Sequence, residues 1–377
     1  MSGLPLDSLA FAMLNAARVD AAVLAGQSLA DNLLGRVDPI ARPAVQDLVY
    51  GSLRRYGRGD FLLGRLLARP LDAPEVRCLL LVALYRLDTR PDAIHTVVDQ
   101  AVAAAGELAE GRFRGLVNGV LRNYLRQQPE LLAGLAADAL ASSQHPDWWF
   151  QRLQSAYPEC WGEIVAAGNA PPPMALRVNL RRGSREAYLA RLGAEGIGAT
   201  PAGEAGLLLD KPLPVERLPG FGEGLVSVQD PAAQIAASLL DPAPGSRVLD
   251  ACAAPGGKAA HLLERGDIEL LALDLKPSRC RRVAENLARL GLHAEIKAAD
   301  CARLDSWWDG RPFDAVLADV PCTASGVVRR NPDAKWLRRE TDVASFAATQ
   351  ARILDALWQV LRPGGKLLYA TCSLFPV

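Results

Sequence analysis

Two cysteines stand in motifs whose residue types indicate covalent chemistry. Cys322 ends the stretch LADVPC at 317–322, and Cys372 lies in YATCS at 369–373, each after an apolar run of strand character. A thiolate is a strong nucleophile that can add to an electron-poor carbon and leave again. Most other cysteines in proteins are simply small buried residues. We apply that interpretation to the remaining five: Cys78, Cys160, Cys252, Cys280 and Cys301.

A loop of small residues at 250–258, with the sequence DACAAPGGK, indicates a ligand-binding turn. Small side chains let a ligand approach the backbone closely, and the helix that follows presents unpaired N–H groups. Asp274 and Asp300 end the next two strand-like runs, where carboxylates can bond ribose hydroxyls and an adenine edge. The phosphate-binding patterns GxxxxGK[ST] and GxGxxG are both missing from the sequence. An adenosyl ligand without phosphates is therefore predicted.

The elements that must position these residues alternate between strands and helices from Val226 onward. In such a doubly wound, Rossmann-like parallel sheet, ligands bind outside the carboxyl ends of the strands. The predicted strands are Arg247–Ala251, Leu270–Leu275, Glu295–Lys297, Phe313–Ala318 and Lys366–Ala370.

The chain before this sheet divides into two regions with different sequence patterns. From Leu6 to about Arg126, apolar residues recur at helical spacing, and Asp-Pro and Arg-Pro pairs mark the turns, which predicts an all-α bundle. Between His145 and Gly220 we expect a small α/β linker domain. It contains helices at 147–157 and 186–193 and strands at 175–180 and 207–209, which suits a compact βαβ unit.

Composition sets the broad class of the protein. The chain has 377 residues, and its 42 basic residues match its 42 acidic ones, so a nucleic-acid footprint has to be a local patch. No secretory signal and no membrane span are predicted. The seven cysteines form no CxxC pair, which predicts reduced thiols in the cytoplasm and no metal site. We expect a monomer.

The motifs together resemble a known family. DACAAPGGK, the DVPC of 319–322 and the ATCS of 370–373 are similar to the signature of the RNA cytosine-C5 methyltransferases. LVYGSLRR at 48–55, the apolar helix at 79–87 and FRGLVNGVLRNYLR at 113–126 resemble the RNA-binding antiterminator NusB. The resemblance implies a NusB-like domain at 1–130, a linker domain at 131–225 and a class I methyltransferase domain at 226–377. It also implies that strands are missing after Val377, because relatives continue past this point.

The resemblance implies a role for each site residue. Carbon 5 of cytosine is a poor nucleophile until a thiolate adds at C6; Cys372 corresponds to that thiolate, and Cys322 to a thiol that helps release the product. Asp319 is expected to act as base or to stabilise the adduct, and also to contact the cofactor. The implied cofactor is S-adenosyl-L-methionine, bound by Cys252, Ala253, Ala254, Pro255, Gly256, Gly257, Lys258, Asp274, Asp300 and Asp319.

The implied partner is 16S ribosomal RNA, and two basic patches are candidates for contacting it. The first follows Cys322 and contains Arg329, Arg330, Lys335, Arg338 and Arg339, with Trp336 either stacking on a base or anchoring the loop. The second lies in the helical domain and contains Arg54, Arg55, Arg58, Arg112, Arg114 and Arg122.

Three alternatives stay open at this point. A transfer RNA methyltransferase shares all of the chemistry, and a non-catalytic assembly factor shares the fold. An amine N-methyltransferase requires a polar motif such as NPPY in place of DVPC, so the thiol at Cys322 argues against it.

Overall fold

The computed structural model describes residues 3–376, apart from the side chains of residues 139 and 140. The predicted domain limits at residues 1 and 377 therefore lie outside the described residues. The chain forms two compact units. The first unit comprises Met1–Pro171, Thr323–Val343 and Cys372–Val377, and the second comprises Pro172–Cys322 and Ala344–Thr371. Two segments from the C-terminal part of the chain, at 323–343 and 372–377, thus belong to the same unit as the N-terminal helices.

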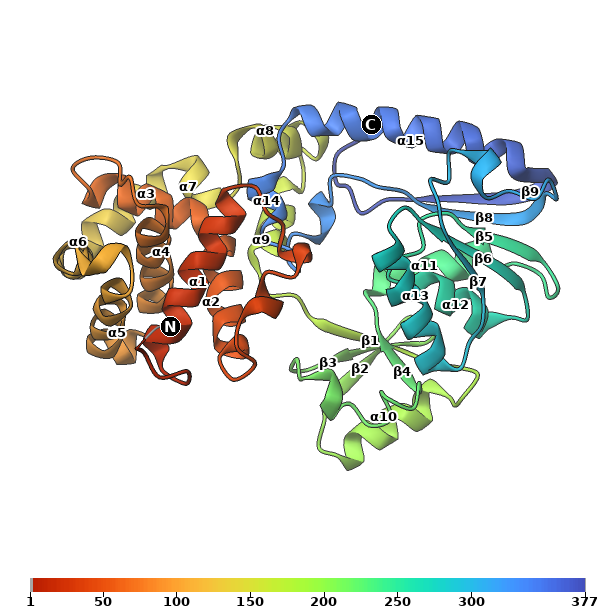
Figure 1. Cartoon of the computed structure of the whole chain (residues 1–377), viewed down its shortest axis with the longest axis horizontal. Coiled ribbons are helices and arrows are strands. Elements are labelled where there is room, and N and C mark those ends of the chain that lie inside the picture. The colour runs from red at the N-terminus through yellow and green to blue at the C-terminus, as the bar shows by residue number, and fades with distance from the viewer. Residues whose placement is uncertain (1–2, 377) are drawn as a thin grey trace. The chain divides into compact units, whose positions relative to one another are not determined.

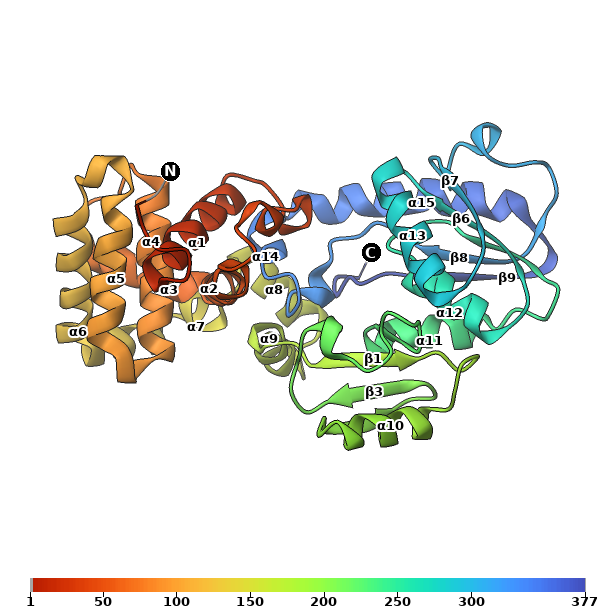
Figure 2. The same ribbon diagram turned by 60° about the horizontal axis from the view of Figure 1, so that its bottom comes forward.

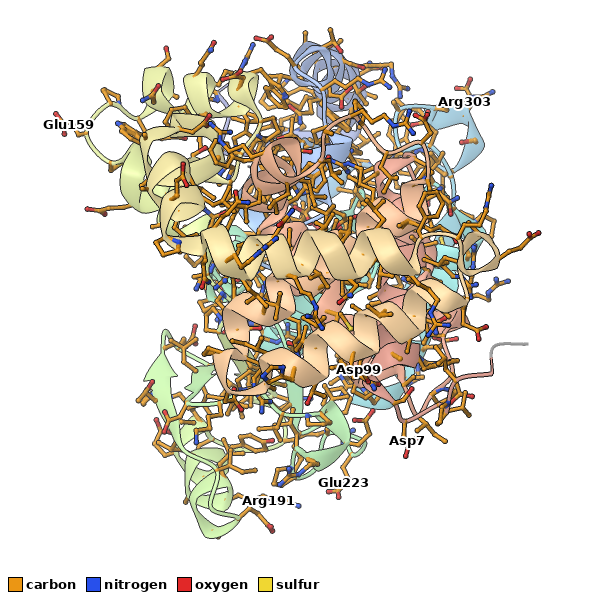
Figure 3. All side chains as sticks on the ribbon, turned by 90° about the vertical axis from the view of Figure 1, so that its left-hand side faces the viewer. Asp7, Asp99, Glu159, Arg191, Glu223 and Arg303 are labelled. Atoms are coloured by element: carbon orange, nitrogen blue, oxygen red, sulfur yellow. The ribbon has the colours of Figure 1, made fainter. Side chains whose placement is uncertain are left out.

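The first unit is built on an α-helical bundle, as predicted (Figure 1). Helix α4 forms its centre, because Leu79–Leu84 is buried around the whole circumference of the helix. Figure 3 shows the side chains of Asp7 and Glu159 projecting outward from this unit. The helices are α1 (Leu9–Leu24), α2 (Arg42–Arg54), α3 (Tyr56–Leu66), α4 (Pro74–Thr89), α5 (Ile94–Gly106), α6 (Arg114–Ala137), α7 (Ala139–Ser143), α8 (Asp147–Ala156) and α9 (Trp161–Asn169).

None of the helices within residues 3–376 is by itself long and apolar enough to cross a membrane. Helix α1 and the segment Leu29–Arg36 meet the criterion together by length and composition, as a pair bent by 118°.

The segment that follows Cys322 packs into this bundle. It contains the short helices η7 (Ser325–Val327) and α14 (Ala334–Leu337). Asp333 accepts hydrogen bonds from the hydroxyl of Ser28 (3.1 Å) and the backbone N–H of Leu29 (3.0 Å), so it fixes the start of a turn 305 residues earlier in the chain. Trp336 donates its indole N–H to the carbonyl of Leu53 at 2.7 Å. The basic loop is therefore anchored by buried polar contacts.

The second unit begins with a small antiparallel sheet. Its strands are β1 (Met174–Val178), β2 (Ala199–Ala202), β3 (Gly206–Leu209) and β4 (Val226–Val228), arranged in the order β2-β3-β1-β4, with α10 (Arg185–Ala194) between β1 and β2.

The compact βαβ unit predicted for this sheet is wrong in one respect. The predicted strand at 207–209 pairs antiparallel with β1. The strand that runs parallel to β1 is the edge strand β2, and β3 lies between the two. This is a split βαβ arrangement. Strand β2 escaped prediction because it contains Pro201, and proline is tolerated in a sheet mainly at its edge.

The larger sheet of the second unit is parallel, with the order β7-β6-β5-β8-β9 (Figure 1). Helices α11, α12 and α13 cover one face, and α15 covers the other (Figures 1 and 2). Neighbouring residues of β5 alternate between the two cores: Val248 packs in the first and Leu249 in the second. The elements are β5 (Arg247–Asp250), α11 (Pro231–Leu240), α12 (Gly257–Arg265), β6 (Glu269–Asp274), α13 (Pro277–Leu290), β7 (Glu295–Ala298), β8 (Phe313–Asp319), α15 (Thr341–Val360) and β9 (Leu361–Ala370).

Strand β9 starts earlier than the predicted Lys366. Its first residue, Leu361, pairs with Phe313, and the register shifts before Lys366 pairs with Ala315. The Pro363-Gly-Gly365 sequence looks like a turn, which hid the strand. A side chain at Gly365 would come within 2.9 Å of the carbonyl oxygen of Asp314, so only glycine fits at this close approach of the two strands.

A buried arginine joins the two sheets of the second unit. Arg177 on β1 is fully buried and forms a bidentate ion pair with Glu264 on α12, at 2.9 and 2.8 Å. Its Nη1 donates to the carbonyl of Gly257 at 2.8 Å and also to the side chain of Gln229. A guanidinium with this many acceptors holds the start of α12 against the small sheet.

We expect Arg177→Met to lower the free energy of unfolding by about 3–5 kcal/mol, because the substitution leaves the Glu264 carboxylate buried without its cation. Adding Glu264→Gln should recover part of this loss. The measurement is urea denaturation of the whole chain followed by circular dichroism. The matched control is Arg311→Met, whose side chain is 64% exposed and whose pairing should contribute less than about 1 kcal/mol. Equal losses of unfolding free energy in the two single variants would show that the buried Arg177 pair stabilises the fold no more than an exposed pair does.

Candidate active site

The loop predicted to bind a ligand lies at the carboxyl end of β5, where the order of strands reverses. The chain runs from β5 through β6 to β7 on one side and then crosses back to β8 and β9 on the other, and in such sheets this reversal opens a crevice at the strand ends. The backbone N–H of Ala253 donates to the carbonyl of Leu273 at 2.8 Å, which ties the loop to β6. The predicted loop therefore lies where such sheets bind ligands.

Helix α13 requires a glycine in this loop. Gly256 has φ +98°, and a Cβ there would lie 3.2 Å from the Cα of Val283. The backbone then turns directly into α12, whose first N–H groups have no partner within the helix. A loop of small residues that leads into a helix N-terminus fits a ligand bound through its backbone contacts, as an adenosyl and amino-acid moiety requires.

Asp274, the last residue of β6, lies beside the loop. Its buried carboxylate accepts from the backbone N–H of Ala254 and of Lys276, both at 3.3 Å, and pairs with Arg279 at 3.2 Å. Arg279 also donates to the carbonyl of Ala254 at 3.1 Å. The buried carboxylate thus positions the loop, and its charge is paired with a half-exposed arginine.

Asp300 lies two residues beyond the end of β7 and is half-buried. One carboxylate oxygen accepts from the backbone N–H of Ala302 at 3.0 Å, and the other pairs with Arg352 at 3.1 Å. Parallel pairing places the ends of β5, β6 and β7 along one edge of the sheet, so Asp300 follows Asp274 along that edge.

Asp319, the last residue of β8, forms an ion pair with Lys258 at 2.6 Å. Lys258 is the second residue of α12, so this contact joins the end of one strand to the helix that follows its neighbour. Both side chains are partly exposed. The structure therefore brings together two residues that lie 61 positions apart in the sequence.

Sequence reasoning missed Asp250, the residue that ends β5. Its side chain is 1% exposed, and its carboxylate has no side-chain hydrogen-bond donor within the described part of the chain. Burial raises the pKa of Asp250 to about 7, and the negative charge of Asp319 raises it further, while Lys258 and the backbone N–H of Cys252 oppose the shift. Its position as the first residue of DACAAPGGK was the only signal in the sequence. A strongly shifted carboxyl beside a candidate ligand loop is typical of functional sites.

The seven cysteines divide differently from the prediction. Cys78, Cys280 and Cys301 are buried, as predicted, and desolvation raises the pKa of Cys78 to about 12. Cys160 is exposed, because it caps the start of α9 at the surface, so its predicted burial is wrong. Cys252 is only partly buried; its hydrogen bond with the thiol of Cys301 raises its pKa, which disfavours its thiolate.

The two predicted reactive cysteines follow neighbouring strands. Cys322 lies three residues after the end of β8, is buried and belongs to the second unit. Cys372 lies two residues after the end of β9, is exposed and belongs to the first unit. Its carbonyl accepts from the N–H of Gly326 at 2.7 Å, where a Cβ would come within 2.9 Å of that oxygen. Exposure is what a nucleophilic thiolate requires.

Two residues of the basic segment after Cys322, Lys335 and Trp336, make contacts within the protein. Lys335 is fully buried, so the structure contradicts its expected contact with RNA phosphate. Its ammonium donates to the carbonyls of Arg54 (3.2 Å) and Gln144 (2.9 Å) and to the side chain of Asn169 (2.9 Å). Trp336 packs against the ring of Tyr56 with centroids 4.6 Å apart, and it anchors the loop.

The arginines of this segment differ in accessibility. Arg329 donates to the carbonyl of Pro171 at 3.0 Å, and Arg338 donates to that of Thr323 at 2.9 Å. Arg330 is half-buried, and Arg339 is exposed. Contact with RNA stays a prediction for these four arginines.

Three family models match successive parts of the chain. Residues 8–126 match the NusB family, residues 145–216 match the ferredoxin-like domain of RsmF/B-like methyltransferases, and residues 237–377 match the 16S rRNA methyltransferase RsmB/F family. The predicted fold class, a NusB-like bundle, an α/β linker and a Rossmann-like methyltransferase, is confirmed.

Curated relatives extend the similarity over nearly the whole chain. Ribosomal RNA small subunit methyltransferase B from Pseudomonas putida is 48% identical, and the alignment covers 96% of this chain and 86% of the relative. The protein of the same name from an Escherichia coli O6:H1 strain is 42% identical, with 95% and 85% covered.

Solved structures agree with this fold. The crystal structure of PH0851 superposes with a TM-score of 0.81 over 99% of this chain and 87% of that one, at 22% identity. A methyltransferase homolog protein from Pyrococcus horikoshii is 31% identical, with a TM-score of 0.55, over 62% of this chain and 76% of that one.

The shifted pKa of Asp250 predicts a specific pH dependence of stability. Because the folded pKa, about 7, lies above the unfolded value, the folded protein binds more protons between about pH 4 and pH 7, and stability falls as the pH rises through this window. Asp250→Asn lacks this titration. We expect the free energy of unfolding of the variant, relative to that of the wild type, to rise by a few kcal/mol as the pH increases from 4 to 8. The measurement is urea denaturation at each pH.

The matched control for this experiment is Asp309→Asn. Despite some desolvation, hydrogen bonds from Arg311 and Arg247 lower the pKa of Asp309. Its contribution to stability is present above the unfolded pKa and is lost as the pH falls, so the control should lose stability most at neutral pH. A pH profile of Asp250→Asn parallel to that of the wild type would contradict a raised pKa.

Proposed function

The chain belongs to the family of ribosomal RNA small subunit methyltransferase B, and we propose that it methylates carbon 5 of one cytosine in 16S ribosomal RNA through a covalent adduct with Cys372. Methyl transfer from S-adenosylmethionine to ribosomal RNA is the activity of this family. The cytosine, its carbon 5 and the adduct are the proposal. The observation that supports them is a pair of cysteines that follow the neighbouring parallel strands β8 and β9.

The cofactor supplies an electrophilic methyl group, and the residues that fit around it lie at the ends of β5 to β8. We assign its binding to Cys252–Lys258, Asp274, Asp300 and Asp319. Two observations support a fit: the close packing that requires Gly256, and the buried Asp250 carboxylate, to which no side chain among the described residues donates a hydrogen bond. Arg177 supports the same loop through the carbonyl of Gly257.

The proposed reaction begins with the Cys372 thiolate. The thiolate would form a bond with C6 of the cytosine, and the electron pair of the C5–C6 double bond would become available at C5 to bond the methyl group. The bond between that methyl group and the sulfonium sulfur would break, and the rest of the cofactor would leave as a neutral thioether. A base then removes the proton from C5, the double bond re-forms and the C6–S bond breaks, so the thiolate is regenerated. Cys322 assists this release, and Asp319 acts as base or bonds the N3 and N4 edge of the ring.

Asp319 has a charge partner that suits either role. In the structure its carboxylate pairs with the ammonium of Lys258 at 2.6 Å. A carboxylate that approaches the base has to exchange or share this partner. The target cytosine also has to leave its stack to reach a thiol, which costs least in an unpaired loop.

Two cysteine variants test the proposed roles. We expect Cys372→Ala to lower methyl transfer at least ~10³-fold, the scale of losing a covalent nucleophile. Cys322→Ala should form the adduct but fail to release it, which gives a covalent protein–RNA complex on a denaturing gel. The double variant should form no complex. The assay uses labelled S-adenosylmethionine and 16S ribosomal RNA, followed by nucleoside analysis for 5-methylcytidine.

Cys160→Ala is the control, because this thiol is exposed but lies outside the proposed chemistry. It should turn over at the wild-type rate. Normal turnover by Cys322→Ala without any adduct would reject its role in release. Transfer to transfer RNA but not to ribosomal RNA would keep the chemistry and overturn the substrate.

A further inference from the structure

A cationic cavity in the first unit is not used by the proposed reaction. It has a volume of ≈ 610 Å³ and opens where α2 passes into α3. Three arginines from the LRRYGR stretch, Arg54, Arg55 and Arg58, line it, and Asp88 is the one carboxylate among its lining residues. The arginines Arg112, Arg114 and Arg122, grouped with them in the sequence, do not line this cavity.

Asp88 neutralises only part of this charge. It accepts a hydrogen bond from Nε of Arg58 at 2.7 Å and another from the hydroxyl of Tyr124 at 2.5 Å. Arg55 lies farther away, at 3.9 Å from the same carboxylate, and its side chain is 46% exposed. Arg55 thus points a mostly unneutralised guanidinium toward solvent beside the cavity.

Arg54 and the neighbouring Lys335 have only neutral hydrogen-bond partners in the described part of the chain. Arg54 donates to the carbonyls of Tyr50 (3.3 Å) and Arg329 (2.8 Å), and its Nε has no partner. The buried ammonium of Lys335 donates to oxygens of Arg54 and of two lining residues, Gln144 and Asn169. Desolvation and the charge of Arg54 lower the pKa of Lys335 to about 7, as expected where positive charge is not balanced.

Burying a charge without a counter-ion is costly, and an anion in the cavity relieves that cost. Guanidinium groups bind phosphate oxygens through two parallel N–H bonds, and a cavity that carries several of them favours a phosphate over a neutral ligand. Ribosomal RNA is the substrate of this family and presents one such anion per nucleotide.

We propose that this cavity binds a backbone phosphate of the ribosomal RNA, with Arg55 as the accessible contact and Arg54 and Arg58 as its neighbours. The inference rests on the proposed function for its ligand but not for its geometry. It gives the helical unit a defined anchoring point for RNA, separate from the residues that act on the cytosine.

The test measures binding of a 16S ribosomal RNA transcript to the full chain by filter binding over a range of NaCl concentrations. For Arg55→Glu we expect affinity about tenfold weaker, the scale of one charged hydrogen bond, and a salt slope of log Kobs reduced by about 1. The control is Arg18→Glu, the same charge change at an exposed residue of α1 that does not line the cavity. This control should bind as the wild type does.

Thermal unfolding of each variant separates binding from folding. If Arg55→Glu unfolds at a lower temperature, Arg55→Gln replaces it, because glutamine keeps part of the packing over the Tyr85 ring. RNA affinity and salt slope equal to those of Arg18→Glu would overturn the proposal. Transfer to cytosine C5 by the wild type is assayed separately. Methylation without any effect of Arg55→Glu on RNA binding would reject the cavity alone, and an effect on binding without methylation would reject the proposed reaction alone.

Discussion

Parallel pairing of β5 with β6 on one side and β8 on the other is the constraint on which the candidate site depends. It fixes the ends of the strands along one edge of the sheet, so that Asp250, Asp274 and Asp319 face a common region although they lie up to 69 residues apart. Hydrophobic packing on both faces of the sheet holds this register, because a slip of one residue would exchange the two cores.

The charges gathered at this edge depend on one another. Lys258 pairs with Asp319 directly, while Asp250 lies buried nearby. Burial raises the pKa of Asp250, and the negative charge of Asp319 raises it further. Arg177 acts from the small sheet, since it holds the carbonyl of Gly257 just before Lys258 in the chain. The small sheet therefore contributes to the geometry of the ligand loop without containing any residue of the proposed reaction.

The first unit carries a different balance of charge. Its bundle takes up the basic segment after Cys322 through Asp333, Lys335 and Trp336, and a lysine expected at the surface becomes a buried donor to neutral oxygens. This concentrates positive charge around the α2–α3 turn. The same contacts that order the segment are thus the ones that leave the cavity in need of an anion.

The sequence by itself determined the fold class, the Rossmann-like sheet and most of the candidate site, because strand period, small-residue loops and strand-end carboxylates are local patterns. It could not determine the split arrangement of the small sheet, the burial of Lys335, the exposure of Cys160 or the raised pKa of Asp250. Each of these depends on residues distant in the chain: β3 inserts between β1 and β2, and Gln144 and Asn169 surround Lys335. Burial and pKa are set by such neighbours, and only the tertiary structure brings them together.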